Sequence, residues 1–181
     1  KWYVLFIIFT ICTTYGSTIW IDKLLKEQNA IVKSHKEDWD RQTRKDYKEK
    51  GRKKRVAVML FALLCNFGIL AFLKYIPYAG ELGLLLPLGI SFYTFQSMGY
   101  VMDVYREIVE PEKNFLKVAL FVSFFPQIIQ GPIAIYDKLA GQLYEGHSLR
   151  LGNLQKGALL VLWGVMKKLV IADRAVNIIN F

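Results

Sequence analysis

Charged residues are absent from four long stretches of the chain and crowded between the first two. The stretches without Asp, Glu, Lys or Arg are 18 to 21 residues long: Trp2–Ile21, Val56–Leu73, Leu82–Met102 and Val118–Tyr136. A helix rises about 1.5 Å per residue, so these lengths match the hydrocarbon core of a bilayer, which is about 30 Å thick. The pattern therefore predicts a membrane protein with several transmembrane helices.

Other classes of protein fit this pattern less well. A buried helix of a soluble protein seldom runs beyond about 14 uncharged residues, and a signal peptide would explain only the first stretch. Strands of a membrane β-barrel alternate apolar and polar residues, whereas Ala57–Leu64 is apolar throughout. We therefore expect an all-α, polytopic transmembrane fold with four to five membrane helices.

The charge boundaries also predict how the chain is organised. Transmembrane helices are expected at 1–21, 56–76 and 82–106, a basic cytoplasmic loop at 22–55, a broken transmembrane helix at 111–136, a loop at 137–156, and a short span or interfacial helix at 157–181. The last segment stays undecided between these two forms because Lys167 and Lys168 interrupt it.

Most of the net charge lies in the segment between the first two stretches. Asp22–Arg55 contains 13 Lys or Arg and 7 Asp or Glu, which gives +6 of the chain's +9. Basic residues in short loops favour the cytoplasmic side, so this segment is predicted to be cytoplasmic. Lys50–Arg55 directly precedes a span, which favours a membrane anchor that meets anionic lipid over a nucleic-acid site. Five residues at helical spacing predict an interfacial helix in this segment: Leu24, Gln28, Ile31, His35 and Trp39.

Polar residues share one side of the third predicted span. Pro87 can begin the helix, and Gln96, Gly99, Asp103 and Arg106 follow at intervals of three, four and three residues. An amide inside a bilayer needs a partner, so this side is expected to face protein or water. It could line a substrate passage, or it could hold interhelical hydrogen bonds with an Asp103–Arg106 ion pair at the cytoplasmic rim. Composition alone favours the second interpretation.

The fourth stretch contains helix breakers. Pro126 and the pair Gly131–Pro132 should interrupt it, as Pro87 interrupts the third. Carbonyl groups freed at such breaks must be satisfied by protein or water, and broken membrane helices often form binding sites. The sequence fits two interpretations of this break: a purely structural interruption of the helix, or part of a binding site.

Three blocks of the sequence resemble the amino-terminal part of membrane-bound O-acyltransferases, most closely their bacterial alginate O-acetyltransferase branch. The blocks are Leu86–Arg106, Glu112–Ile133 and Trp163–Arg174. The resemblance implies a multi-helix membrane enzyme that transfers an acyl group, usually acetyl, to hydroxyls of a cell-surface or exported polysaccharide. The first helix and the basic segment are similar in topology only.

The resemblance also implies a catalytic histidine in an apolar sequence late in the enzyme. Histidine can take a proton from a sugar hydroxyl near neutral pH. Neither His35 nor His147 has an apolar setting, so no catalytic residue is predicted in this chain and the histidine is expected beyond Phe181. The chain is then expected to be about the first two-fifths of such an enzyme and to be inactive alone.

Residues of the first two blocks are expected to shape the passage around that histidine. They are Tyr93, Gln96, Asp103, Tyr105, Arg106, Pro126, Gln127, Gln130, Gly131 and Pro132. No metal and no bound cofactor are predicted, and the donor is expected to be an acyl thioester, either acetyl-CoA or a carrier-linked group. The expected partners are the lipid bilayer, the polysaccharide acceptor and extracytoplasmic acetyl-transfer proteins, with no nucleic acid.

Two other functions remain alternatives. A related branch of the family transfers D-alanine to teichoic acid, although Phe92–Gln96 and Phe124–Gln127 are closer to the acetylating branch. A non-catalytic scaffold or transporter could also use a broken helix to bind a solute. A histidine within an apolar downstream segment would favour the enzyme.

Overall fold

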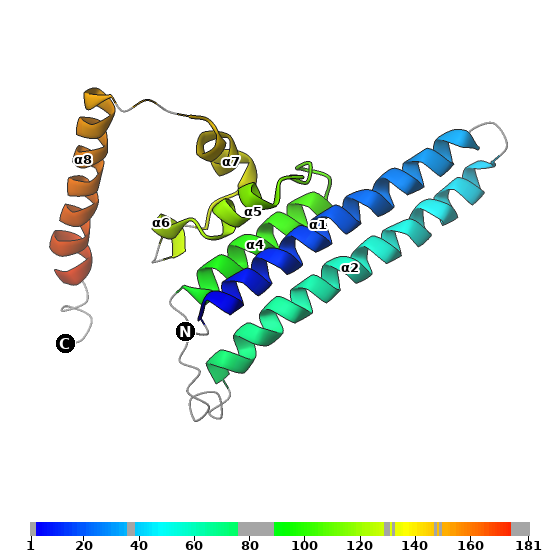
Figure 1. The fold of residues 1–181 in the computed structure, drawn as a ribbon, viewed down its shortest axis with the longest axis horizontal. Coiled ribbons are helices and arrows are strands. Elements are labelled where there is room, and N and C mark those ends of the chain that lie inside the picture. The colour runs from blue at the N-terminus through cyan, green and yellow to red at the C-terminus, as the bar shows by residue number, and fades with distance from the viewer. Residues whose placement is uncertain are drawn as a thin grey trace. The chain divides into compact units, whose positions relative to one another are not determined.

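The described part of the chain contains helices and no strand (Figure 1). The structure is a computed structural model that describes residues 3–35, 39–75, 89–128, 131, 133–146, 148 and 150–174. The all-α prediction is confirmed for these residues. The chain divides into two units, Lys1–Tyr144 and Glu145–Phe181.

The two longest helices form an antiparallel hairpin. α1 (Tyr3–Ser34) and α2 (Arg41–Tyr75) contain 32 and 35 residues and lie side by side (Figure 1). Their most apolar windows have mean hydropathies of 1.8 and 2.6. By length and composition these are the two helices, within the described ranges, that could cross a membrane.

The structure differs from the loop predicted at 22–55, because most of that segment is helical. α1 continues to Ser34 and α2 begins at Arg41. The segment contains no proline and one glycine, and its exposed sides carry ion pairs between residues four apart, such as Lys53–Glu49 at 3.4 Å. Such pairs support a helix in water. The charge boundary therefore marks a change of solvent and does not end either helix.

Gln28 and Gly51 hold the charged ends of the two helices together. The Gln28 side chain is buried, and its Nε2 donates to the Lys48 carbonyl across the hairpin at 2.9 Å. A Cβ at Gly51 would lie only 2.5 Å from Cδ of Gln28, so glycine permits this approach. Gln28, which the sequence placed on an interfacial stripe, therefore packs between helices.

Small polar side chains form the contact between the apolar parts of the hairpin. Asn66 in α2 donates to Thr13 Oγ1 at 3.0 Å and to the Ala62 carbonyl at 2.9 Å. On α1, the Thr13 hydroxyl donates in turn to the carbonyl of Thr10 in its own helix at 3.0 Å. Small residues that satisfy their own hydroxyls let helices approach closely in an apolar environment.

The helix α4 (Ile90–Tyr105) lies against both α1 and α2 and forms the centre of the first unit (Figure 1). It buries residues on several sides, including Met98 and Val101. Three shorter helices follow it: α5 (Phe115–Val122), α6 (Phe125–Ile128) and α7 (Tyr136–Tyr144). α5 packs against α1, α4 and α7, and α6 packs against α4, so the short helices cover α4 and also reach α1 of the hairpin directly.

The fourth apolar stretch contains a break between α5 and α6. α5 ends at Val122, and α6 begins at Phe125 with Pro126 as its second residue. A helix that continued through Pro126 would need its N–H to donate to the carbonyl of Val122, four residues earlier, but proline has no N–H and its ring clashes with that carbonyl. α5 therefore ends at Val122, and α6 can begin with Pro126 in its first turn, where proline is tolerated. The other predicted breakers, Pro87 and Pro132, lie outside the described residues.

The second unit consists of α8 (Leu151–Met166) and the π-helical turn η1 (Lys167–Ala172) that follows it directly. Its apolar side chains are exposed, and the Lys167 ammonium lies 5.3 Å from the ring centroid of Trp163. Whether this helix crosses or lies on a membrane stays a prediction.

Candidate functional site

Gln96 joins α4 to the broken end of α5. Its side chain is 2% exposed, and Nε2 donates to the Phe121 carbonyl at 2.9 Å. Phe121 lies in the last turn of α5, where carbonyl groups lack the helical donors that interior residues have. Within the described residues the Phe121 carbonyl also accepts from the Phe124 N–H at 3.4 Å, so the Gln96 amide supplies the shorter of its two hydrogen bonds at the end of α5.

Tyr93 and Tyr100 flank Gln96 on the inner side of α4. The positions 93, 96 and 100 are three and four residues apart, so the side chains lie along one face. Tyr93 is 2% exposed, and its hydroxyl has no hydrogen-bond partner among the described residues. Buried hydroxyls are usually bonded, so this one is available to a group from outside the described structure.

Tyr100 begins a polar network that continues into α5 and α7. Its hydroxyl accepts a hydrogen bond from the Glu112 backbone N–H at 2.8 Å. Its ring stacks on that of Tyr136 with the centroids 4.2 Å apart, and Phe121 packs edge-on against Tyr136 at 4.9 Å. Three helices thus contribute aromatic rings to one cluster.

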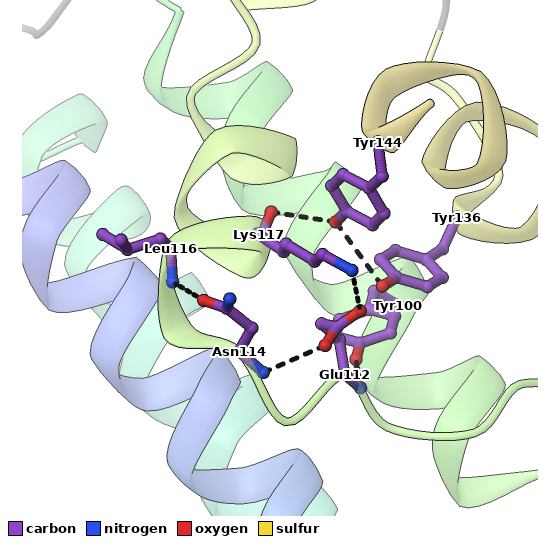
Figure 2. A network of polar contacts seen from close by, with 7 residues as sticks. All are labelled: Tyr100, Glu112, Asn114, Leu116, Lys117, Tyr136 and Tyr144. Carbon is purple, nitrogen blue, oxygen red and sulfur yellow. Dashed lines mark hydrogen bonds and ion pairs between the residues drawn. The ribbon is translucent and has the colours of Figure 1, made fainter. Parts of the chain in front are cut away.

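Glu112 and Asn114 organise the loop that enters α5, as Figure 2 shows. One carboxylate oxygen of Glu112 accepts from the Asn114 N–H at 3.0 Å, and the other lies 3.7 Å from the Lys117 ammonium. The side chain of Asn114 accepts from the Leu116 N–H at 2.9 Å and caps the helix. An asparagine at this position satisfies one of the free N–H groups of the first turn.

Tyr144 closes the network from α7 (Figure 2). Its hydroxyl donates to the Lys117 carbonyl at 2.9 Å, and its oxygen lies 3.5 Å from that of Tyr136. The Lys117 ammonium is 4.9 Å from the centroid of the Tyr144 ring, within the range of a cation–π contact. Burial raises the pKa of Tyr144, so the hydroxyl stays protonated and remains a donor at neutral pH.

The last turn of α4 does not contain the ion pair considered from the sequence. Asp103 and Tyr105 are half-buried and Arg106 is exposed, and Asp103 and Arg106 form no salt bridge within the described ranges. Arg55 of α2 pairs instead with Glu107 at 2.7 Å. Glu107 has a φ of 61°, a left-handed conformation that is uncommon for a residue with a side chain.

Pro126, Gln127 and Gly131 lie together around α6. The Gly131 N–H donates to the Gln127 carbonyl at 3.0 Å, and a Cβ on Gly131 would lie 2.6 Å from Cα of Gln127. The Gln127 side-chain oxygen is buried without a hydrogen-bond partner in the described part of the chain. Gln130 and Pro132, also predicted here, lie outside the described residues.

Gly89 brings α6 against the beginning of α4. It has a φ of 75°, and a Cβ there would lie 2.4 Å from the Ile128 carbonyl oxygen. A side chain would therefore be both strained and in collision with backbone. This contact places the second group of predicted residues beside the helix that carries the first.

Five residues complete the network that were not predicted from the sequence to belong to the site. They are Glu112, Asn114, Lys117, Tyr136 and Tyr144. The only local signal was Asn114, a favoured helix-capping residue directly before an apolar run. The tyrosines are separated from Tyr100 by a turn and a helix, so their contact with it required the tertiary structure.

The chain is similar to several bacterial O-acetyltransferases. It is 30% identical to the peptidoglycan O-acetyltransferase of Helicobacter pylori over 161 residues, which covers 68% of this chain and 31% of that protein. It is 40% identical over 89 residues to a probable alginate O-acetylase of Pseudomonas syringae pv. tomato, or 49% of this chain and 17% of that protein. The corresponding protein of Pseudomonas aeruginosa is 38% identical over 90 residues, or 50% of this chain and 17% of that protein.

These relatives confirm the predicted resemblance to membrane-bound O-acyltransferases of the alginate O-acetyltransferase branch. The chain spans about a third or less of the length of the curated relatives it matches. No family model matches the chain. No solved structure matches it either.

Proposed function

We propose that the chain is the amino-terminal part of a membrane O-acyltransferase that transfers acetyl groups to hydroxyls of a cell-surface or exported polysaccharide. The observation that carries this proposal is the 30–40% identity to proteins named as acetylating peptidoglycan or alginate. The all-helical fold with two helices able to cross a membrane supports it.

The chemistry requires a base for the acceptor hydroxyl. In this proposal a histidine from a part of the enzyme outside this chain takes the proton while the hydroxyl oxygen attacks the acyl carbonyl. The donor is an acyl thioester, acetyl-CoA or a carrier-linked group, and its thiol leaves as the ester forms. Proteins outside the membrane that pass acetyl groups to the acceptor are further proposed partners.

The described residues contribute positioning in this scheme. Gln96 fixes the end of α5 against α4, and Gly89 fixes α6 at the other end of the same face. Two of the buried polar atoms without a hydrogen-bond partner among the described residues, Tyr93 Oη and Gln127 Oε1, are proposed to face the passage. Asp103, Tyr105, Arg106 and Gly131 are also proposed to shape the passage. Gln130 and Pro132, which lie outside the described residues, are assigned to it from the family resemblance alone.

The proposed topology places the charged ends of α1 and α2 in the cytoplasm. The segment 22–55 carries 13 basic and 7 acidic residues, and basic residues near spans are retained on that side. α1 then runs from the outside inwards and α2 returns. The protein would be a multi-pass component of the plasma membrane.

The test is to delete the gene in its natural host and measure ester-linked acetate in the isolated cell-surface and exported polysaccharides. Acetate is expected to fall to background and to return with a plasmid copy of the gene. Loss of ester-linked D-alanine from teichoic acid, with acetate unchanged, would favour the related branch instead. If neither ester changed, a non-catalytic scaffold or transporter would replace the enzyme proposal.

A further inference from the structure

An apolar groove crosses the surface of the α1–α2 hairpin. It measures about 430 Å³ and is lined by Trp20, Leu24, Lys54, Ala57, Val58 and Phe61. Trp20 and Leu24 are four positions apart on α1, and Lys54, Ala57 or Val58, and Phe61 recur every three or four positions on α2, so each helix contributes one face. The two aromatic side chains are exposed.

The groove lies where the charge-free part of each helix ends. The first charge-free stretch ends at Ile21 and the second begins at Val56, and the two helices are antiparallel. Trp20, Ala57 and Phe61 therefore lie on the apolar side of this boundary, and Lys54 lies on the charged side. Tryptophan is enriched at the membrane–water interface, where one part of its ring is apolar and another can donate a hydrogen bond.

The charge beside the groove is positive. Lys54 is exposed and forms no salt bridge with any described residue. The nearest acidic group in the adjoining hollow, Glu27, lies 4.0 Å from the Lys23 ammonium, and the same hollow also contains Lys50. A ligand that fits both features has a long apolar chain and an anionic headgroup.

We propose that this groove binds one anionic phospholipid, with an acyl chain along Trp20, Val58 and Phe61 and its phosphate at the Lys54 ammonium. This site is independent of the proposed acyl transfer, since none of its residues belongs to the α4 network. It would fix the depth of the hairpin in the bilayer at the point where the helices leave the apolar phase. A single basic residue near an anionic surface favours binding by about fivefold.

The experiment uses the full-length protein in vesicles of phosphatidylcholine that contain brominated phosphatidylglycerol or brominated phosphatidylcholine. Bromine on the acyl chain quenches tryptophan fluorescence at short range. The contribution of Trp20 is the difference between the protein and its Trp20→Phe variant. That contribution is expected to show about fivefold stronger apparent binding of the brominated phosphatidylglycerol.

The charge-matched variants Lys54→Gln and Lys53→Gln test the assignment. Lys53 is also exposed, but it pairs with Glu49 and does not line the groove. Lys54→Gln should remove most of the preference and Lys53→Gln should leave it nearly unchanged. The proposal fails if both lipids quench Trp20 equally, if neither does because other protein covers the groove, or if the two variants reduce the preference equally.

Discussion

The charged ends of the hairpin and the inner face of α4 are both polar, but they use polar groups in opposite ways. Lys53 and Glu49 pair on the exposed side of α2, where water would solvate either group alone. Gln96 has no access to water and depends on the Phe121 carbonyl. The stability lost when a polar group is removed therefore depends on whether its partner can bond to water instead, and less on how many polar groups a region contains.

Glycine substitutions should give the largest contrast between the two regions. Gly89→Ala would force a side chain into a left-handed conformation and against the Ile128 backbone, whereas a Cβ at Gly51 would meet the far end of the Gln28 side chain, which can change rotamer at the cost of its hydrogen bond to Lys48. We expect Gly89→Ala to lower the free energy of unfolding by more than about 2 kcal/mol and Gly51→Ala by less than about 1 kcal/mol. Denaturant titration in detergent, followed by circular dichroism, measures both.

Gly99→Ala provides the control for this first contrast. Gly99 lies within α4 and has open space where a Cβ would be. Alanine there should be neutral or should stabilise the helix by up to about 1 kcal/mol. Equal effects of Gly89→Ala and Gly99→Ala would contradict the packing described between α4 and α6.

Removing a glutamine side chain should give the second largest difference in stability between the two regions. Gln96→Ala would leave the Phe121 carbonyl without its amide donor, and we expect a loss of about 1–3 kcal/mol in stability. Gln42→Ala removes an exposed amide that bonds Asp46 in the same helix, and it should change stability by less than about 0.5 kcal/mol.

Acyl transfer adds a second readout for Gln96. If the inner face of α4 shapes the passage, Gln96→Ala and Gln130→Ala in the full-length enzyme should reduce polysaccharide acetylation in membranes with matched protein amounts. Normal acetylation and normal expression in both variants would contradict the passage proposal. The predicted loss of stability is tested separately, by the unfolding measurement.

Ion pairs should give the smallest contrast. The Arg55 side chain is 11% exposed and that of its partner Glu107 is 53% exposed, so Glu107→Gln should cost about 1–2 kcal/mol because it leaves a charge partly buried. Glu49→Gln breaks the exposed pair with Lys53 and should cost less than about 0.5 kcal/mol. Thermal unfolding of both variants at low and high salt measures the difference, and a larger loss for Glu49→Gln would reverse the comparison.

Part of the candidate site could be predicted from the sequence because it depends on helix periodicity. The spacing of Gln96, Gly99, Asp103 and Arg106 indicated one face of a helix, and the structure buries Gln96 and half-buries Asp103 but leaves Gly99 and Arg106 exposed. The helix break near Pro126 was also expected from proline alone, although its place before the proline required the backbone. The Asp103–Arg106 pair was a reasonable local alternative, but Glu107 turns away from the helix and meets Arg55 of α2.

The all-helical class, the two long apolar helices and the resemblance to O-acyltransferases follow from the amino-acid sequence alone. They depend on composition, on the lengths of uncharged stretches and on residues close together in the chain. The helical form of the basic segment required the tertiary structure, because charge reports the surrounding solvent, whereas contacts between the helices, such as the hydrogen bond from Gln28 to Lys48 beside Gly51, hold the charged ends together. The tertiary structure also brought Tyr100, Tyr136 and Tyr144 together, since the partner of a buried polar group can lie far away in sequence.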